Sequence, residues 1–318
     1  MKVLVTGSSG WLGRHLFPIL REAGHEPLGL DVVGSAWTDV IASVADRAAI
    51  DKLFTQHRFD GVIHAGALHK PDIARYPQQA FVDVNVTGTL NLLEAVCRHG
   101  VQRFIFTSTT SLMISQRIRT EQSDMAIWLD ETSGPIEPRN IYGVTKLAAE
   151  ALCRQHHIER GLAVVILRTA RFFPEDDDTL ADVSGPNLKA NELLNRRATV
   201  RDMARAHLTA LERVSERGFG LYIVSAPTPF ARSDTQALKT DARAVTLDRF
   251  PEADALYARE GWSLPKSLGR VYDGTLIERD LGFRYETRFS DVLAALRDGR
   301  PSPVAHDPTY TSPIMHPG

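Results

Sequence analysis

The sequence has little cysteine, no long apolar run and almost no excess of charge of either sign. Its two cysteines, Cys97 and Cys153, are far apart and form no Cys-x-x-Cys pair, which argues against a disulfide scaffold and a structural zinc site. No stretch approaches the ~20 apolar residues of a membrane span, and the apolar run after Met1 is too short for a signal peptide. We therefore expect a soluble, cytoplasmic protein with no membrane partner.

The charge balance argues against one further class of partner. Lys plus Arg total 37 and Asp plus Glu total 39, so the formal net charge is −2 at pH 7. Nucleic-acid binders carry a basic stripe, whereas charges here are spread along the chain, with one acidic run at 175–178. We expect no nucleic-acid partner. His156 and His157 have no acidic or cysteine companion at ligand spacing, so we also expect no metal site.

The first half of the chain alternates short apolar runs with amphipathic runs, which is typical of a parallel sheet covered by helices. The predicted strands span 2–5, 27–30, 60–64, 104–106 and 164–167, and the predicted helices span 12–23, 46–56, 81–99 and 141–160. After residue 168 we expect helices over 187–195, 200–213 and 289–297, and a strand over 221–224. The pattern predicts an α/β fold, a Rossmann-type doubly wound parallel sheet with a smaller C-terminal α/β substrate lobe.

Three regions follow from this pattern. Residues 1–168 are expected to form the Rossmann domain, which carries the motifs described below. Residues 169–299 are expected to form mainly the substrate-binding lobe, with segments that return to the first domain. Residues 300–318 contain five prolines, which prevent regular structure, so we expect an extended or mobile tail.

A glycine-rich turn, Thr-Gly-Ser-Ser-Gly-Trp-Leu-Gly at residues 6–13, follows the first strand and opens a helix. Gly7 allows the tight turn, Gly10 lets the backbone approach a phosphate, and Gly13 lets the helix pack closely on the strand. A helix N-terminus of this kind holds the pyrophosphate of a dinucleotide. The alternative is a plain βα turn, which three glycines at this spacing disfavour.

Asp31 closes the second strand, about 20 residues after the glycine turn, where a carboxylate can accept hydrogen bonds from the adenosine ribose. Its charge repels a 2′-phosphate, and no Arg follows before Arg47, so NAD is favoured over NADP. Asp31 could instead merely start a turn. Asp39 and Val40 are weaker candidates for contacts with the adenine edge.

Tyr142 and Lys146 lie four residues apart in the helix predicted over 141–160, and therefore on one face of it. A free phenol has a pKa of about 10, and a nearby ammonium together with a positive nicotinamide lowers it. Tyr142 could then take a proton from a secondary hydroxyl while hydride leaves the same carbon. Lys146 would also hold the nicotinamide ribose. Taken alone, the pair is better explained as surface residues, but the glycine turn upstream favours catalysis.

A hydroxyl cluster at residues 107–111 directly follows the strand predicted over 104–106. A hydroxyl there can hydrogen-bond the reacting oxygen and place it beside Tyr142. Thr109 is the first choice for this role and Ser108 the second. Capping of the strand end by these hydroxyls is the alternative interpretation.

Three other residues could contact the substrate. His69 follows a strand at the carboxyl edge of the sheet, where ligands of such folds bind, although it could equally be a solvated loop residue. Arg168 and Arg171 could bind an anionic group of the substrate. Arg168 could also pair with a carboxylate in the core.

Together these features resemble the extended short-chain dehydrogenase/reductase family, specifically its NAD-dependent epimerase/dehydratase branch. The resemblance covers roughly residues 1–295 and rests on the glycine turn, Asp31, Asp39-Val40, residues 64–67 (His-Ala-Gly-Ala), residues 85–89 (Asn-Val-Thr-Gly-Thr), the hydroxyl cluster, and Tyr142 with Lys146. It implies NAD as the cofactor. It also implies a homodimer, joined through a four-helix bundle of the helices at 81–99 and 141–160.

The motifs and the resemblance together assign a role to each candidate residue. The expected cofactor-binding residues are Gly7, Ser9, Gly10, Trp11, Leu12, Gly13, Asp31, Asp39, Val40, Ala65, Gly66, Ala67, Asn85, Thr107, Tyr142, Lys146 and Arg168. The expected catalytic residues are Tyr142, Lys146, Thr109 and Ser108. The expected substrate contacts are His69, Thr110, Arg171 and Phe172.

The sequence departs from the family pattern at two places. Sugar 4,6-dehydratases of the family carry an Asp-Glu pair after the catalytic Thr, and Thr110 and Ser111 stand there instead, so dehydration is disfavoured. The usual diphosphate-binding signatures are also absent, since residues 171–174 precede the acidic run at 175–178 and residues 270–273 read Arg-Val-Tyr-Asp. The resemblance therefore leaves open whether the substrate carries a nucleotide diphosphate.

The sequence thus predicts an NAD-dependent enzyme that acts on a secondary hydroxyl of a sugar or nucleotide-sugar, in the first place an epimerase with a transient 4-keto-type intermediate. The alternative enzyme is a net NAD-dependent dehydrogenase or reductase on a non-nucleotide polyol or sugar acid. A further alternative, an NAD-binding regulatory protein without catalysis, is disfavoured because Tyr142 and Lys146 are both present.

Overall fold

The computed structural model describes residues 1–120, 122–176 and 183–313. Within these ranges, one sheet of seven parallel strands has the order β3-β2-β1-β4-β5-β7-β8. The strands are β1 (Lys2–Thr6), β2 (Glu26–Asp31), β3 (Val40–Ile41), β4 (Gly61–His64), β5 (Arg103–Thr109), β7 (Ala163–Thr169) and β8 (Phe219–Val224). The strand order reverses between β1 and β4, as in a doubly wound sheet. This arrangement confirms the predicted fold class.

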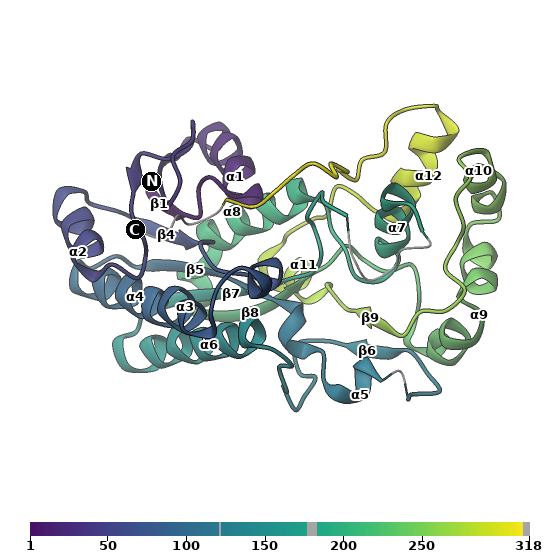
Figure 1. The fold of residues 1–318 in the computed structure, drawn as a ribbon, viewed down its shortest axis with the longest axis horizontal. Helices are drawn as coiled ribbons and strands as arrows, with labels where there is room; N and C mark the ends of the chain where they lie inside the picture. The colour runs from purple at the N-terminus through teal and green to yellow at the C-terminus, as the bar shows by residue number, and fades with distance from the viewer. Residues whose placement is uncertain (121, 177–182, 314–318) are drawn as a thin grey trace.

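Helices cover both faces of the sheet (Figure 1). One face carries α1 (Trp11–Glu22) and α8 (Val200–Arg217), and the other carries α2 (Arg47–Gln56), α4 (Gly88–Arg98) and α6 (Ile141–Arg160). Successive strand residues point to opposite faces, and β5 shows the consequence. Ile105 packs in the core beneath α1 and α8, whereas Phe104 and Phe106 pack in the core beneath the other three helices. Because both faces are buried, the strands are almost continuously apolar.

The smaller lobe lies beyond the carboxyl ends of the strands, at the right of Figure 1. It contains a two-stranded parallel sheet of β6 (Ile127–Leu129) and β9 (Arg270–Tyr272). Its helices are α5 (Gln116–Arg119), α7 (Gly185–Glu192), α9 (Thr235–Arg249), α10 (Ala253–Arg259) and α12 (Phe289–Arg297), whereas α11 (Leu276–Leu281) packs on β8 of the large sheet and on α8. In the described part of the chain, no helix combines the length and apolar character that a membrane crossing requires.

The prediction of one long helix over 81–99 is wrong in one respect, because the structure interrupts this helix. The structure has α3 (Gln78–Phe81), a π-helix (Val82–Thr87) and then α4. The side chain of Asn85 in the π-helix is bonded to both the N–H and the C=O of Leu68, at 2.9 Å each. A local widening of this kind lets a side chain reach out of the helix and is frequent near functional sites.

The strand predicted over 104–106 is also longer than expected, so the hydroxyl cluster does not simply follow it. β5 pairs residue by residue with β7 as far as Thr109, opposite Thr169. Residues 107–109 are therefore strand residues, and only Thr110 and Ser111 follow, in a short 3₁₀ turn (Thr110–Met113). The other predicted helices and strands occur with ends displaced by a few residues.

Two histidines are buried against the sheet without a charged partner. His207 on α8 is bonded to the hydroxyl of Thr107 at 2.8 Å and to the carbonyl of Met203 at 2.7 Å. Burial lowers the pKa of His207 to about 4 and, helped by the charge of Lys146, that of His64 to about 3. Both side chains are therefore neutral in the folded protein at neutral pH.

These lowered pKa values predict a loss of stability in acid. Below pH ~6.5 the unfolded chain protonates both histidines while the folded chain does not, so each histidine lowers the free energy of unfolding by about 1.4 kcal/mol per pH unit down to its folded pKa. In urea titrations between pH 4.5 and 7, the free energy of unfolding of His207→Gln should fall with decreasing pH less steeply than that of the wild type, by that amount per pH unit. Exposed His99 provides the control, since His99→Gln should keep the wild-type slope. Equal slopes for all three proteins would contradict the prediction.

Candidate active site

A cavity of about 1310 Å³ lies along the carboxyl edge of the sheet, where the strand order reverses. The glycine turn, the ends of β2, β4, β5 and β7, the start of α6, and Tyr310, Ser312 and Pro313 all contribute to its wall. The predicted site residues that line it are Gly7, Gly10, Trp11, Leu12, Gly13, Asp31, Ala65, Gly66, Ala67, His69, Thr107, Ser108, Thr109, Thr110, Tyr142, Lys146, Arg171 and Phe172. Ser9, Asp39, Val40, Asn85 and Arg168 do not line it.

The glycine turn has the backbone geometry that its residues suggest. Gly7 has a φ of +72°, and a Cβ there would lie 2.7 Å from the backbone nitrogen of Gly66. A Cβ on Gly13 would lie 2.2 Å from the carbonyl oxygen of Gly7. Gly10 is the N-cap of α1 and supplies no side-chain hydrogen bond. The backbone nitrogen of Trp11 donates to the hydroxyl of Tyr310, and a phosphate in the cavity would meet the N–H groups that follow it at the start of α1.

Asp31 lies in the cavity wall at the end of β2. Its carboxylate accepts hydrogen bonds from the backbone nitrogens of Ser9 at 2.9 Å and Val33 at 3.1 Å. Burial raises its pKa, and these hydrogen bonds oppose the rise. The side chain of Ser9, which was expected to bind the cofactor, instead donates to the carbonyl of Val33 at 2.7 Å. Ser9 therefore positions the loop that carries Asp31.

Asp39 and Val40, the weaker candidates for contacts with the adenine edge, lie outside the cavity wall. The carboxylate of Asp39 accepts from the backbone nitrogen of Gly29 at 2.7 Å, and Val40 pairs with Leu30 in the sheet. The cavity wall is formed a few residues later, by Ala42, Ser43 and Val44. These three residues lie just beyond the end of β3. The sequence pattern did not predict this short strand and therefore did not place them in the cavity wall.

Arg168 and Asn85 are also not in the wall. Arg168 is buried and forms two hydrogen bonds to Glu150 on α6, with Nε at 3.0 Å and Nη2 at 2.7 Å. Of the two alternatives left open for it, the core carboxylate is thus the one observed. The side-chain amide of Asn85 holds the loop after β4 through Leu68 and donates to Thr145 on α6 at 3.0 Å. Both residues position the wall without forming it.

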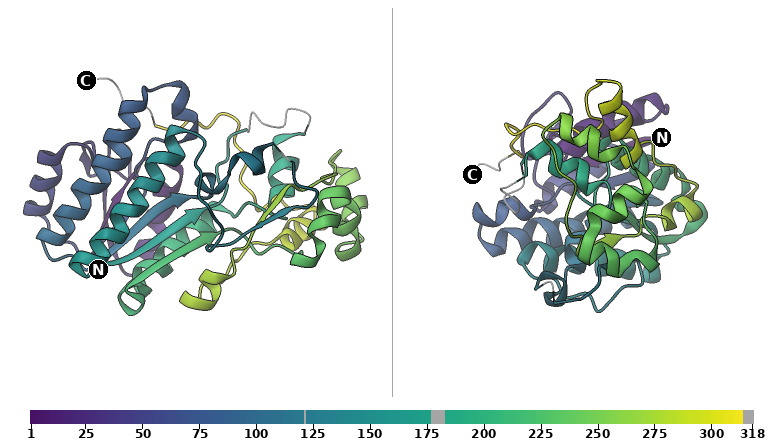
Figure 2. Two further views of the ribbon diagram at one scale, coloured as in Figure 1. Left: turned by 90° about the horizontal axis from the view of Figure 1, so that it is seen from below. Right: turned by 90° about the vertical axis from the view of Figure 1, so that its right-hand side faces the viewer.

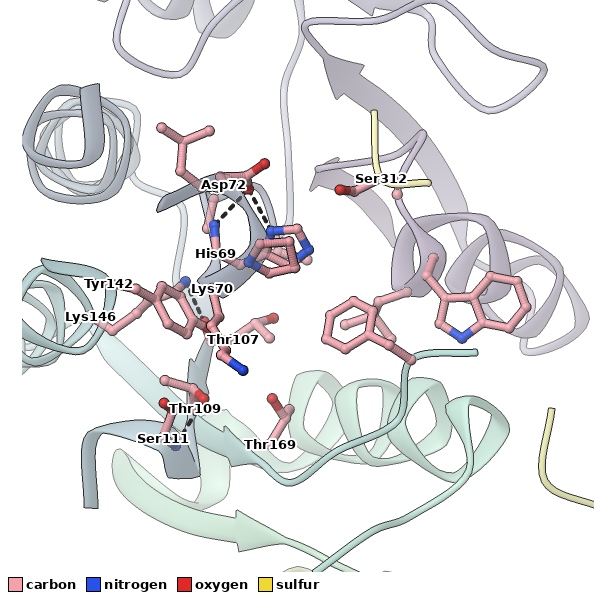
Figure 3. Close-up of a pocket in the computed structure, with 18 of the residues that line it drawn as sticks. His69, Lys70, Asp72, Thr107, Thr109, Ser111, Tyr142, Lys146, Thr169 and Ser312 are labelled. Atoms are coloured by element: carbon pink, nitrogen blue, oxygen red, sulfur yellow. Dashed lines mark hydrogen bonds and ion pairs between the residues drawn. The ribbon is translucent and has the colours of Figure 1, made fainter. Parts of the chain in front are cut away.

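Tyr142 and Lys146 project from the start of α6 toward the end of β5 (Figure 3). Asn140 caps this helix, and its side chain accepts from the backbone nitrogen of Gly143 at 2.9 Å. Lys146 Nζ donates to the carbonyl of Thr107 at 2.8 Å. Tyr142 lies between Thr109 on one side and the loop that carries His69 on the other. The structure therefore brings the predicted base, lysine and hydroxyl together in one cavity.

The predicted lowering of the Tyr142 pKa is wrong for the chain alone. Burial raises the pKa of Tyr142 to about 12; the hydroxyl of Thr109 opposes the rise and the charge of Asp72 adds to it. Burial also lowers the pKa of Lys146 to about 7. The ammonium group of Lys146 donates to the carbonyl of Thr107, and burial of Lys146 disfavours the charge of this group. Ser108, the second choice for a reacting hydroxyl, donates to Glu150 at 2.6 Å.

His69 belongs to a pair that sequence reasoning missed. Its Nδ1 lies 2.5 Å from the carboxylate of Asp72, which also accepts from the His69 backbone nitrogen at 2.8 Å. Hydrogen bonds from His69 and the nearby charges of His69 and Arg75 lower the pKa of Asp72 although burial opposes them. The His69 ring lies 5.3 Å from the ring of Phe173, centroid to centroid. His69 is therefore held in a fixed orientation in the wall.

One part of the cavity carries an arginine wall. We use this name for Arg171, Arg196, Arg197 and Arg270, with Arg119 and Arg139 at its rim, all of which line the cavity. One carboxylate, Glu192, pairs with three of them: Arg171 at 3.1 Å, Arg196 at 2.9 Å and Arg197 at 2.8 Å. Positive charge is therefore in clear excess here.

The excess charge has a visible electrostatic effect. Burial lowers the pKa of Arg196 to about 10, the charge of Glu192 opposes the change, and the charges of Arg270 and Arg171 add to it. Nε of Arg270 is buried and has no hydrogen-bond partner among the described residues. Leaving such groups buried without a partner costs free energy, so an anionic ligand at this wall would relieve the repulsion.

Residues 3–184, more than half of the 318-residue chain, match the NAD dependent epimerase/dehydratase family. The chain belongs to this family. The expected cofactor is thereby confirmed, since the family is NAD-dependent and the glycine turn and Asp31 lie in one cavity.

Two curated relatives show which kinds of enzyme the chain is similar to. A UDP-glucose 4-epimerase of Halalkalibacterium halodurans is 32% identical over 175 residues, which cover 53% of this chain and 50% of that protein. A dTDP-glucose 4,6-dehydratase of Streptomyces griseus is 26% identical over 328 residues, covering 92% of each chain. The chain spans about half the length of the curated UDP-glucose 4-epimerases that it matches.

A solved structure shares the family fold. A short-chain dehydrogenase/reductase superfamily protein from Agrobacterium tumefaciens, with bound NAD, has a TM-score of 0.66 and 22% identity, and the match covers 94% of this chain and 98% of that one. Identity at this level shows the fold alone.

The arginine wall predicts measurable anion binding. With NAD saturating, inorganic pyrophosphate should raise the melting temperature by a few degrees, because it binds only the folded chain. Arg270→Gln should lose about half of the rise or more. Arg213→Gln is the control, since Arg213 is exposed on α8 and pairs with Glu216. An equal rise in all three proteins, or the same rise with sodium chloride at matched ionic strength, would contradict a specific site.

Proposed function

We propose that this protein is an NAD-dependent epimerase that oxidises a secondary hydroxyl of a nucleotide-sugar and reduces the resulting ketone from the opposite face. One observation carries the proposal: a single cavity joins the glycine turn and Asp31 to Tyr142, Lys146 and Thr109. The names of its relatives, among them several UDP-glucose 4-epimerases, support the reaction type. Thr110 and Ser111 in place of an acidic pair disfavour dehydration.

The side chains divide the work as follows. NAD supplies the hydride acceptor, and its positive nicotinamide favours the phenolate of Tyr142 against the effect of burial. Tyr142 takes the proton of the reacting hydroxyl and returns it when the ketone is reduced. The Thr109 hydroxyl holds the reacting oxygen beside the phenol. Lys146, anchored on the Thr107 carbonyl at 2.8 Å, holds the nicotinamide ribose.

The arginine wall supports a substrate with an anionic substituent. Guanidinium groups bind a diphosphate through paired hydrogen bonds. The acidic run at 175–178, which argued against a diphosphate, is partly neutralised: burial raises the pKa of Glu175, and Asp176 lies 3.9 Å from Lys189. Residues 177 and 178 are outside the described part of the chain. A net dehydrogenase acting on a sugar acid is the second candidate, because the same wall would accept a carboxylate.

The cofactor content of the purified protein separates the two candidates. An epimerase recycles NADH within one active site, so protein purified without added NAD should release close to one nicotinamide cofactor per chain on denaturation. A net dehydrogenase exchanges its cofactor in every turnover. Protein that is empty, and that accumulates NADH with glucuronate or galacturonate but not with UDP-glucose, would overturn the epimerase in favour of the second candidate.

The role of Tyr142 has its own test. Tyr142→Phe keeps the ring but removes the base, so turnover of UDP-glucose should fall by about 10²–10⁴-fold. The bound cofactor, measured by absorbance after denaturation, should stay at the wild-type level. Tyr76→Phe, at a half-buried tyrosine outside the cavity wall, is the matched control. Retained activity in Tyr142→Phe would remove this residue from the mechanism.

We also propose a homodimer formed through α6 and its neighbours. Val144 and Ile158 on α6 are 48% and 73% exposed, and Ala151 between them is also exposed. Their spacing places them along one side of the helix, and an apolar stripe in solvent favours burial against a second copy. Light scattering should give twice the 35.2 kDa chain mass, and Ala151→Glu should halve it. A monomeric wild-type protein would contradict the dimer.

The cytoplasm is the compartment that we propose. Cys97 and Cys153 are both free thiols, which fits a reducing compartment. Recovery of the protein in the periplasmic or secreted fraction of its native cells would contradict this location.

A further inference from the structure

The C-terminal segment, defined here as residues 300–313, returns from α12 to the first turn of α1. It has no helix or strand, as expected, but it packs on the domain instead of extending into solvent (Figures 1 and 2). Val304 is 6% exposed in the main core. The backbone nitrogen of Asp307 donates to the carbonyl of Pro174 at 2.9 Å, and Nδ1 of His306 lies 3.0 Å from Nζ of Lys189. The segment is thus anchored at the carbonyl of Pro174 and at Lys189 on α7.

Beyond these anchors, Tyr310 packs on the start of α1. Its ring lies 5.2 Å from the ring of Trp11, edge to face. The guanidinium of Arg14 lies 5.4 Å from the Tyr310 ring and 5.7 Å from the Trp11 ring. Trp11 is the first residue of α1, next to the uncapped N–H groups of the glycine turn. Aromatic and cation–π contacts of this kind hold a chain segment in place.

The same segment faces the cofactor site. Tyr310, Ser312 and Pro313 line the cavity that Gly10 and Asp31 also line, and Ser312 accepts a hydrogen bond from Arg75 at 3.3 Å. Figure 3 shows Ser312 across the cavity from Tyr142.

The surroundings of the Tyr310 phenol fit this placement. Burial raises its pKa to about 12; Arg14 and the backbone amide of Trp11 oppose the rise, and the charges of Glu175 and Asp31 add to it. Tyr310 is therefore close to the groups expected to meet the pyrophosphate and the adenosine ribose.

We propose that Tyr310, Ser312 and Pro313 form the outer wall of the dinucleotide site, with Tyr310 contacting bound NAD beside the pyrophosphate. The sheet edge and the glycine turn supply the inner walls. NAD leaves only when this segment detaches from Trp11 and Arg14, so the segment slows cofactor release. The proposal rests on NAD as the cofactor and is independent of which sugar is the substrate.

The release rate of NADH tests this wall. Protein loaded with NADH is mixed with excess NAD, and the loss of NADH fluorescence is followed. Deletion of residues 308–318 keeps the Val304, His306 and Asp307 anchors, and it should speed release about tenfold, as should Tyr310→Ala. Tyr310→Phe should release within about twofold of wild type, because the ring supplies the contact. Thr311→Ala, at an exposed neighbour, is the matched control.

A double-mutant cycle adds a second measurement. If Tyr310 acts through its contact with Trp11, the effects of Trp11→Leu and Tyr310→Ala on release should be less than additive. Thermal melting of each variant separates loss of the wall from loss of the fold. Release at the wild-type rate, or slower, in both the deletion and Tyr310→Ala would overturn the proposal. No sugar is added in this experiment, so release at the wild-type rate would not bear on the epimerase assignment. Equally, a failure to detect epimerisation would not bear on the proposed outer wall.

Discussion

The placement of α6 on the sheet depends on the buried carboxylate of Glu150. It accepts hydrogen bonds from Arg168 on β7 and from Ser108 on β5, and all three side chains are almost completely buried. Tyr142, Lys146 and Glu150 are spaced by four residues, so they lie on one face of the helix. Breaking a buried ion pair leaves an unpaired charge at a cost of about 3–5 kcal/mol. Glu150 therefore holds the reactive pair over the end of β5.

The two ends of the cavity have opposite electrostatic character. At the glycine turn, Asp31 supplies one buried carboxylate, suited to hydroxyl donors. At the other end, three arginines of the wall pair with Glu192. A ligand with ribose hydroxyls and a ligand with an anionic substituent would each favour one end. The charges at the two ends of the cavity thus favour a different kind of ligand at each end.

The predictable parts of the site are those set by local geometry. The glycine turn and the Tyr142–Lys146 spacing need only a strand end and two turns of helix, and the α6 bounds follow from its cap at Asn140 and the glycine at 161. The sequence could not show whether Arg168 lines the cavity or pairs with Glu150, because the answer depends on how α6 is oriented about its own axis. Asp39 lies outside the cavity wall because its carboxylate accepts a hydrogen bond from the backbone nitrogen of Gly29, ten residues earlier. Such contacts leave no periodic pattern.

The contact between Trp11 and Tyr310 joins two residues that are 299 positions apart in the sequence. During synthesis, the N-terminal part folds while later residues are still being added. The first strand, the glycine turn and the sheet edge can therefore form before Tyr310 has left the ribosome. A nascent chain would offer an open nucleotide site, and the finished chain a covered one. The order of translation thus places cofactor loading before closure.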